Sequence, residues 1–110
     1  AALDCGQYDE RWANIHMNPE EAVAAAKDLN AATLLPSHVG RFTIARHAWD
    51  EPFIRVASAS SGGGPRLLTP VIGEPVRLEN ERQEFARWWV DVVLDSTNPL
   101  AGTVASSKGG

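Results

Sequence analysis

The chain has 110 residues, a formal net charge of -4 at pH 7 and a single cysteine, Cys5. This length allows one domain with a modest core, and one cysteine excludes an internal disulfide. The mild acidity, without any basic stripe, excludes charge-driven nucleic-acid binding, and no apolar stretch reaches the about 20 residues of a transmembrane segment.

The first third of the chain predicts a strand, a helix and a second strand. Residues 1–6, AALDCG, are an apolar run closed by glycine, which is typical of a buried strand. Asn18 and Glu21 have the spacing of a capping box around Pro19, and Asn30 suits a left-handed helix end. The buried-type run ATLLP follows, so the pattern indicates two neighbouring parallel strands.

The middle of the chain predicts shorter elements. Residues 41–46 are either a strand or an extended connection, and Asp50 is placed to cap a helix over residues 51–60. After a glycine-rich loop, residues 66–78 read as two short β segments, because Pro70 and Pro75 interrupt a regular central strand.

The C-terminal part predicts a helix over residues 79–95 and a flexible tail over residues 96–110. Asn80 and Gln83 have capping-box spacing at the start of an amphipathic pattern that includes Trp88 and Trp89. Two tryptophans on one face need a partner, either the core of the same domain or another protein.

Several side chains are candidates for chemistry: His16, His38, His47, Asp4, Asp9, Glu10, Asp50 and Glu51. His38 follows a buried strand, where ligands collect in parallel α/β sheets, so it is either a zinc ligand or a structural histidine at a strand end. His16, just before a helix cap, is a proton donor, a substrate contact or a loop residue. The three histidines form no HxH, HxxxH or HExxH pair, so the chain alone does not supply the three protein ligands of a catalytic zinc site.

The order of three motifs resembles a known family. Residues 6–12 read G-x-Y-x-x-R-W, residues 16–22 read H-x-N-P-E-E-A, and residues 36–42 read P-x-H-x-G-x-F. Over residues 3–78 the chain is similar to the C-terminal part of metallo-β-lactamase-fold hydrolases. The branch it resembles contains the N-acyl-phosphatidylethanolamine-hydrolysing phospholipases D and bacterial lactonase-like relatives.

The resemblance implies roles for individual residues. His38 matches the last metal-binding histidine of the family, a ligand to one of two zinc ions, and His16 matches a histidine of the active site. Tyr8, Arg11 and Trp12 match the loop that shapes the substrate pocket. Val39 and Arg41 depart from the family's Trp and Thr at these positions, which bears on substrate preference.

The resemblance also implies what lies elsewhere. The family's H-x-H-x-D-H motif and bridging aspartate have no match here, so we expect an incomplete piece of a longer protein, with little or no zinc bound by this chain alone. The expected fold is α/β, the C-terminal half of an αβ/βα sandwich: a small mixed sheet with helices on one side over residues 1–78, plus the amphipathic helix. The open face of the sheet would be covered by the N-terminal half of the parent, a second copy of the chain or that helix.

Two functions follow as hypotheses. In the first, the chain is the C-terminal portion of a zinc-dependent hydrolase that acts on a phosphodiester, a lactone or a related ester or amide, of small-molecule or lipid-like type. In the second, it is a stand-alone non-catalytic module for oligomerisation or interaction. No secretory signal pattern is visible at the start, so cytoplasmic is the default compartment.

Overall fold

The computed structural model describes residues 1–92 and contains three strands, two α-helices and two short 3-10 helices. In chain order these are β1 (Ala2–Asp4), η1 (Glu10–Trp12), α1 (Pro19–Asp28), β2 (Thr33–Ser37), α2 (Glu51–Ser60), β3 (Arg66–Leu67) and η2 (Trp88–Asp91). The predicted tail and the last residues of the predicted C-terminal helix lie outside the described residues. In the described part, no helix has the length and apolar character that crossing a membrane requires.

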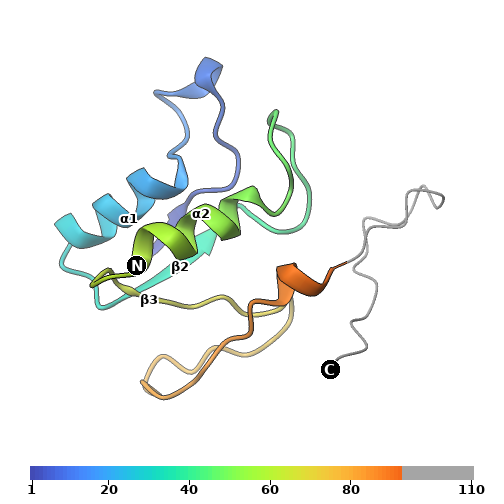
Figure 1. The fold of residues 1–110 in the computed structure, drawn as a ribbon. Helices are drawn as coiled ribbons and strands as arrows, with labels where there is room; N and C mark the ends of the chain where they lie inside the picture. The colour runs from blue at the N-terminus through green and yellow to red at the C-terminus, as the bar shows by residue number, and fades with distance from the viewer. Residues whose placement is uncertain (93–110) are drawn as a thin grey trace.

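The three strands form one parallel sheet in the order β1-β2-β3, with β2 in the centre (Figure 1). Ala2 pairs with Leu35 and Asp4 with Ser37, while Thr33 pairs with Arg66 on the other side of β2. The βαβ prediction is confirmed, but the prediction of a mixed sheet is wrong. α1 connects β1 to β2 and α2 connects β2 to β3, and such helical crossovers return the chain in the same direction.

Both helices cover the same face of the sheet, as predicted, and contact each other along their length (Figure 1). The core lies between helices and sheet and consists of Val23 and Ala26 of α1, Leu34 of β2 and Val56 of α2. β2 alternates between buried residues, such as Leu34, and half-buried ones, such as Leu35. The described residues therefore cover the helix side of the sheet more completely than its other side.

The predicted boundaries of α1 are confirmed by its caps. The Asn18 side chain accepts from the backbone of Glu21, and the Glu21 carboxylate accepts from the backbone of Asn18, which completes the capping box around Pro19. Asn30 has a positive φ of 55 and ends the helix in the left-handed conformation. At α2 the helix begins where expected, but Asp50 makes no side-chain cap bond.

The predicted α-helix over residues 79–95 does not form within its described part, residues 79–92, where only the short 3-10 helix η2 occurs. The Gln83 side chain accepts from the backbone of Arg77 and donates to the carbonyl of Pro75, and the Gln83 carbonyl accepts from Arg66. The polar groups of Gln83 are therefore hydrogen-bonded to residues outside the predicted helix and not to a helical backbone. The Asn80 side chain makes a local turn to the backbone of Arg82, because this residue type competes with helix formation.

The second β segment predicted within residues 66–78 is also absent, since only Arg66–Leu67 pairs with β2. The tryptophan pair nevertheless docks onto its own domain. Trp89 is 4% exposed and stacks on Phe53 of α2 with ring centroids 4.8 Å apart, while Trp88 meets the same ring edge-on. Of the two alternatives for the tryptophans, packing in the core is confirmed for Trp89.

Candidate functional site

The candidate site begins where β1 and β2 end side by side. Asp4 is the last residue of β1, and it pairs with Ser37, directly before His38. A Cβ built on Gly6 would lie 2.0 Å from the His38 carbonyl oxygen, so only glycine permits this approach of the two backbone segments. His38 itself has a positive φ of 58, a conformation that is uncommon for residues other than glycine.

His16 reaches the same place from the loop before α1. Its backbone donates a hydrogen bond to the Trp12 carbonyl (3.0 Å), and two residues later Asn18 fixes the start of α1. The Trp12 ring meets the His16 ring edge-on with centroids 6.0 Å apart. The rigid helix start and the 3-10 turn together place His16 beyond the strand ends.

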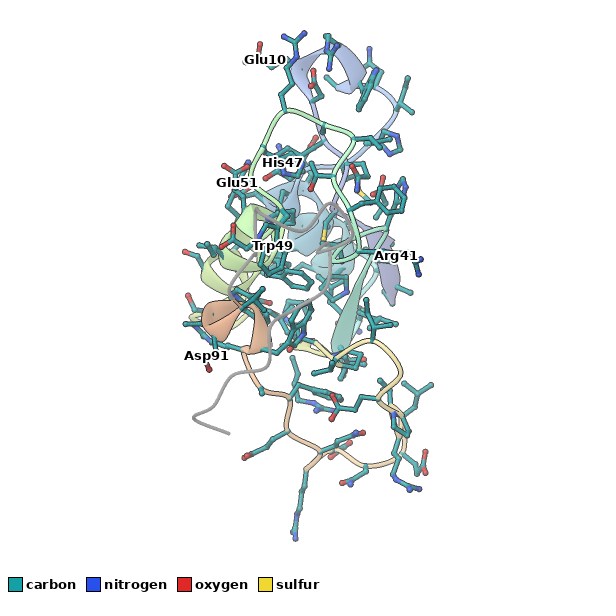
Figure 2. The ribbon with its side chains drawn as sticks, turned by 90° about the vertical axis from the view of Figure 1, so that its right-hand side faces the viewer. Glu10, Arg41, His47, Trp49, Glu51 and Asp91 are labelled. Atoms are coloured by element: carbon teal, nitrogen blue, oxygen red, sulfur yellow. The ribbon has the colours of Figure 1, made fainter. Side chains whose placement is uncertain are left out.

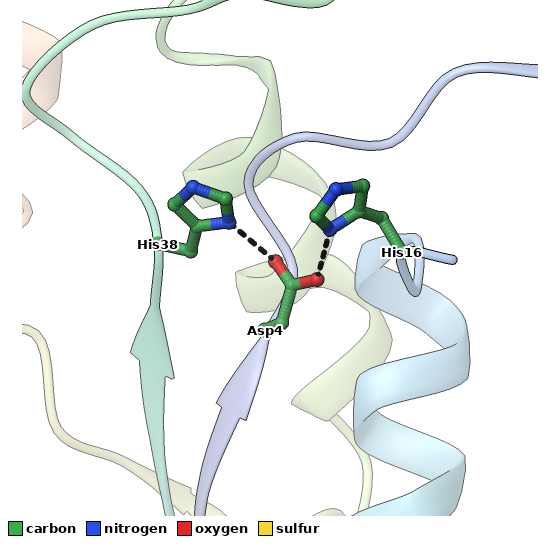
Figure 3. A group of neighbouring side chains, drawn as sticks. All are labelled: Asp4, His16 and His38. Atoms are coloured by element: carbon green, nitrogen blue, oxygen red, sulfur yellow. Dashed lines mark hydrogen bonds and ion pairs between the residues drawn. The ribbon is translucent and has the colours of Figure 1, made fainter. Parts of the chain in front are cut away.

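Asp4, His16 and His38 converge on one point (Figure 3). His16 Nδ1 lies 2.7 Å from Asp4 Oδ2, and His38 Nδ1 lies 3.5 Å from Asp4 Oδ1. The two imidazole centroids are 5.4 Å apart, and one donor atom from each of the three residues lies within 4.8 Å of the others. This is the group of His, Cys, Asp and Glu side chains in residues 1–92 that could hold a metal ion.

The donor set fits a transition metal. Two imidazoles and a carboxylate are the ligand types that zinc and related ions take in proteins. In addition, Asp4 Oδ1 is buried without a hydrogen-bond partner among the described residues, although buried polar atoms are nearly always paired. Asp4, His16 and His38 are therefore a possible metal-binding group.

A pocket of about 670 Å³ opens beside His16. Its wall includes Tyr8, Arg11, Arg46, His47 and Arg55. The pocket lies between the loop after β1, the start of α1 and the start of α2, and Figure 2 shows His47 close to Glu51 at that helix start. Its lining combines aromatic surface with guanidinium and carboxylate groups.

Tyr8 is the best anchored member of the pocket wall. Its ring is stacked on His47 with centroids 4.1 Å apart, the Arg55 guanidinium lies 4.7 Å from its centre, and its hydroxyl donates to Glu51. Burial and the Glu51 carboxylate raise the pKa of Tyr8. The side chain therefore stays a neutral phenol at physiological pH and contributes shape and hydrogen bonding instead of a charge.

Of the other two residues predicted for the pocket, Arg11 lies in its wall and Trp12 does not. Arg11 forms two hydrogen bonds of 2.8 Å to the Asp9 carboxylate, which hold the pKa of Asp9 well below its usual range. Arg11 lines the pocket with its charge already paired, whereas Trp12 lies against His16 and outside the lining.

Three residues had no assigned role in the sequence-based prediction. Asp4 was a candidate carboxylate, and its position at the carboxyl end of a strand parallel to the one before His38 was a usable signal. Arg46 and His47 line the pocket, where His47 stacks on Tyr8, while Trp49 lies against Trp88.

Cys5, the single cysteine of the chain, directly follows Asp4. It is fully buried, and burial raises the pKa of its thiol to about 12. The thiol therefore stays protonated and is no nucleophile at neutral pH.

Comparisons with known proteins find relatives over part of the chain. An uncharacterized protein of Mycobacterium tuberculosis is 39% identical over 77 residues, 67% of this chain and 21% of the relative. The mitochondrial N-acyl-phosphatidylethanolamine-hydrolyzing phospholipase D of Saccharomyces cerevisiae is 33% identical over 78 residues, 67% of this chain and 17% of that protein. The outer membrane protein RomA of Klebsiella pneumoniae is 51% identical over 41 residues, 37% of this chain and 31% of that protein.

The chain thus spans between a sixth and a third of the length of these relatives. No family model matches it, and no solved structure matches it. The predicted resemblance to the phospholipase D branch is confirmed as a distant and partial similarity. The fold is a small α/β unit, and the metallo-β-lactamase assignment stays a prediction.

Proposed function

We propose that this chain is the C-terminal portion of a zinc-dependent hydrolase of the metallo-β-lactamase fold and is not catalytically complete by itself. The observation that carries the proposal is the convergence of Asp4, His16 and His38 at the ends of β1 and β2. The similarity to a phospholipase D over 78 residues supports the same class.

In this proposal His38 binds a metal and His16 faces the substrate. A zinc ion lowers the pKa of a bound water to near neutrality and so provides a hydroxide nucleophile. His38 is suited to holding the ion because its side chain is half exposed at the strand end. His16 is more enclosed and lies at the pocket, so it orients substrate or donates a proton to the leaving group.

The pocket beside His16 is proposed to take the substrate, a phosphodiester, lactone or related ester or amide of small-molecule or lipid-like type. Tyr8 gives it a rigid aromatic wall, and Arg46 adds a cationic group for which the described residues provide no ion pair. A cation next to an aromatic face suits an anionic or strongly polar substrate group. Further substrate contacts, and the remaining metal ligands, would come from the N-terminal half of the parent protein.

The test is metal analysis and a hydrolase assay on the longer parent protein, with His38→Ala as the variant. We expect the variant to lose metal stoichiometry and activity together. His47→Ala is the matched control for stoichiometry, since it removes an imidazole whose Nδ1 bonds to the Ala48 carbonyl and not to Asp4. Unchanged metal content and activity in His38→Ala would remove His38 from the site.

A second candidate function is favoured by exposed apolar side chains. Leu78 is 75% exposed, Ile72 69% and Val90 68%, all in the segment after β3. Large apolar side chains in such number suit contact with another protein, either the parent's remaining half or a second copy of the chain. Sedimentation of the isolated chain tests this second function, because a stable monomer contradicts the stand-alone oligomerisation module.

A further inference from the structure

We propose that Asp4 is a positioning residue whose single carboxylate accepts the Nδ1–H of both His16 and His38. The shared acceptor turns the two Nε2 atoms outward together, toward the metal and the substrate. This inference rests on the proposed function and deepens it, because it adds an orienting role for Asp4 to the metal-binding role of His38 and the substrate role of His16.

The contact to His16 is a hydrogen bond and not a pair of metal ligands. His16 Nδ1 and Asp4 Oδ2 are 2.7 Å apart, within the range of charge-assisted N–H···O bonds. Two donor atoms on one tetrahedral zinc, each about 2.0–2.2 Å from the ion, would lie roughly 3.3–3.5 Å apart. The short distance therefore assigns a proton, and not a metal, to the space between these atoms.

The second contact of Asp4, with His38, is too long for a hydrogen bond in this structure. His38 Nδ1 is 3.5 Å from Asp4 Oδ1, longer than a normal hydrogen bond, and this oxygen is buried without another hydrogen-bond partner in residues 1–92. Leaving a buried carboxylate oxygen unpaired is costly, and the His38 side chain is 47% exposed. A small rotation of that ring satisfies Oδ1, so both carboxylate oxygens are used.

The carboxylate fixes the tautomer of each imidazole. An ionised carboxylate only accepts hydrogen bonds, so each neutral ring must carry its proton on Nδ1 and keep a lone pair on Nε2. Figure 3 shows the second nitrogen of each ring on the side away from Asp4, beyond the strand ends. Metal-bound histidines commonly have their other ring nitrogen bonded to a carboxylate in this way, which orients the ring and raises its basicity.

The backbone holds the carboxylate in place between the two rings. Asp4 lies opposite Ser37 in the β1–β2 pairing, and the next residue, Cys5, donates its N–H to the Ser37 carbonyl at 3.2 Å. The close approach of Gly6 to the His38 carbonyl fixes the other side. Asp4 thus connects a strand end, a turn and a loop that belong to three separate parts of the sequence.

The test is the tautomeric state of each histidine, measured by long-range ¹H–¹⁵N correlation NMR on the metal-free 110-residue chain at a pH where the imidazoles are neutral. We expect the Nδ1–H form at both His16 and His38. His47 is an internal reference, because its Nδ1 bonds to the Ala48 carbonyl and its state does not depend on Asp4. A predominant Nε2–H form at either His16 or His38 in the unsubstituted chain overturns the inference.

Two variants sharpen the test. In Asp4→Ala both rings should shift toward Nε2–H while His47 keeps its signal. In Asp4→Asn, which preserves shape, the amide has one acceptor oxygen and one NH₂ donor, so we expect one ring to keep Nδ1–H and the other to change. Unchanged tautomers in Asp4→Asn would refute the role of the shared carboxylate even if Asp4→Ala fails to fold.

The same substitution has a separate consequence in the parent protein, where loss of the orienting carboxylate should weaken zinc affinity about 10–100-fold. Because the NMR measurement needs no metal, it tests the role of Asp4 independently of the proposed zinc-dependent function. Nδ1–H tautomers in the chain together with a zinc-free parent would reject the proposed function alone. Nε2–H tautomers together with a zinc-bound parent would reject the Asp4 inference alone.

Discussion

Replacement of His38 by glycine should produce a more stable protein than replacement by alanine. His38 has a φ of 58, in the left-handed region, where a Cβ is close to the following carbonyl oxygen. Both substitutions remove the same half-exposed imidazole, so their difference isolates the backbone conformation. The strain of a Cβ there amounts to about 1–2 kcal/mol.

The expected difference follows from two opposing effects. Glycine relieves the strain but gains freedom in the unfolded chain, which costs roughly 0.5–1 kcal/mol relative to alanine. The net expectation is that His38→Gly is the more stable variant, by about 0.75 kcal/mol at the centre of these ranges and about 1.5 kcal/mol at most. In urea, with a slope of about 1–3 kcal/mol per molar, the central value moves the midpoint by roughly 0.25–0.75 M.

A matched control lies in α1. Ala24 is exposed in the helix interior, so Ala24→Gly should destabilise by about 1 kcal/mol, the opposite sign for the same change of side chain. Urea unfolding of all three variants, followed by circular dichroism, measures the differences. If His38→Ala is more stable than His38→Gly by the margin seen at Ala24, the left-handed conformation at His38 is refuted.

Three further predictions concern the same framework. Gly6→Ala should destabilise by about 1–3 kcal/mol, because its Cβ would lie 2.0 Å from the His38 carbonyl oxygen; an unchanged urea midpoint would contradict this contact. Leu34→Ala removes a fully buried side chain of the central strand and should cost about 2–5 kcal/mol in urea unfolding, whereas a cost under 1 kcal/mol would place Leu34 outside the core. Arg55 hydrogen bonds lower the pKa of Glu20 from its ordinary value of 4.5, so the pair stabilises the fold above that pH and the effect is lost as pH falls through the lower folded-state pKa. Glu20→Gln should therefore cost under about 1 kcal/mol at pH 7 and nothing in strong acid, and a penalty that persists in acid would show another cause.

The elements that sequence predicted best are those with local causes. The capping box of Asn18 and Glu21 needs only four successive residues, so the start of α1 could be read directly. The parallel pairing of β1 with β2 followed from a strand, a helix and a strand in close succession. Placing His38 at a strand end was possible for the same reason.

The C-terminal segment shows where prediction from local sequence patterns fails. Asn80 and Gln83 have the spacing of a capping box, yet the Gln83 side chain bonds to the loop around Pro75 and Arg77. These partners are set by tertiary structure, which overrides a local preference worth at most about 1 kcal/mol. Sequence spacing alone could not distinguish the two outcomes.

The candidate site could be identified only once the fold was known. His16 and His38 are separated by a whole helix and strand, and their meeting depends on Asp4 lying beside the end of β2. Spacing rules for metal ligands detect pairs on one element, such as HxxxH on a helix, and not residues brought together by three elements.

Two costs to stability coincide at this edge of the sheet, and their location supports a functional origin. Asn30 also has a positive φ, but asparagine tolerates that conformation and the position ends a helix. At His38 the conformation is similar, yet no helix ends there, and glycine would suit the backbone better. The buried, unpaired Oδ1 of Asp4 is a second unfavourable feature, 3.5 Å from the same histidine. Since strain and unpaired polar groups persist mainly where they serve a site, both features are consistent with the proposed role of His38 as a metal ligand.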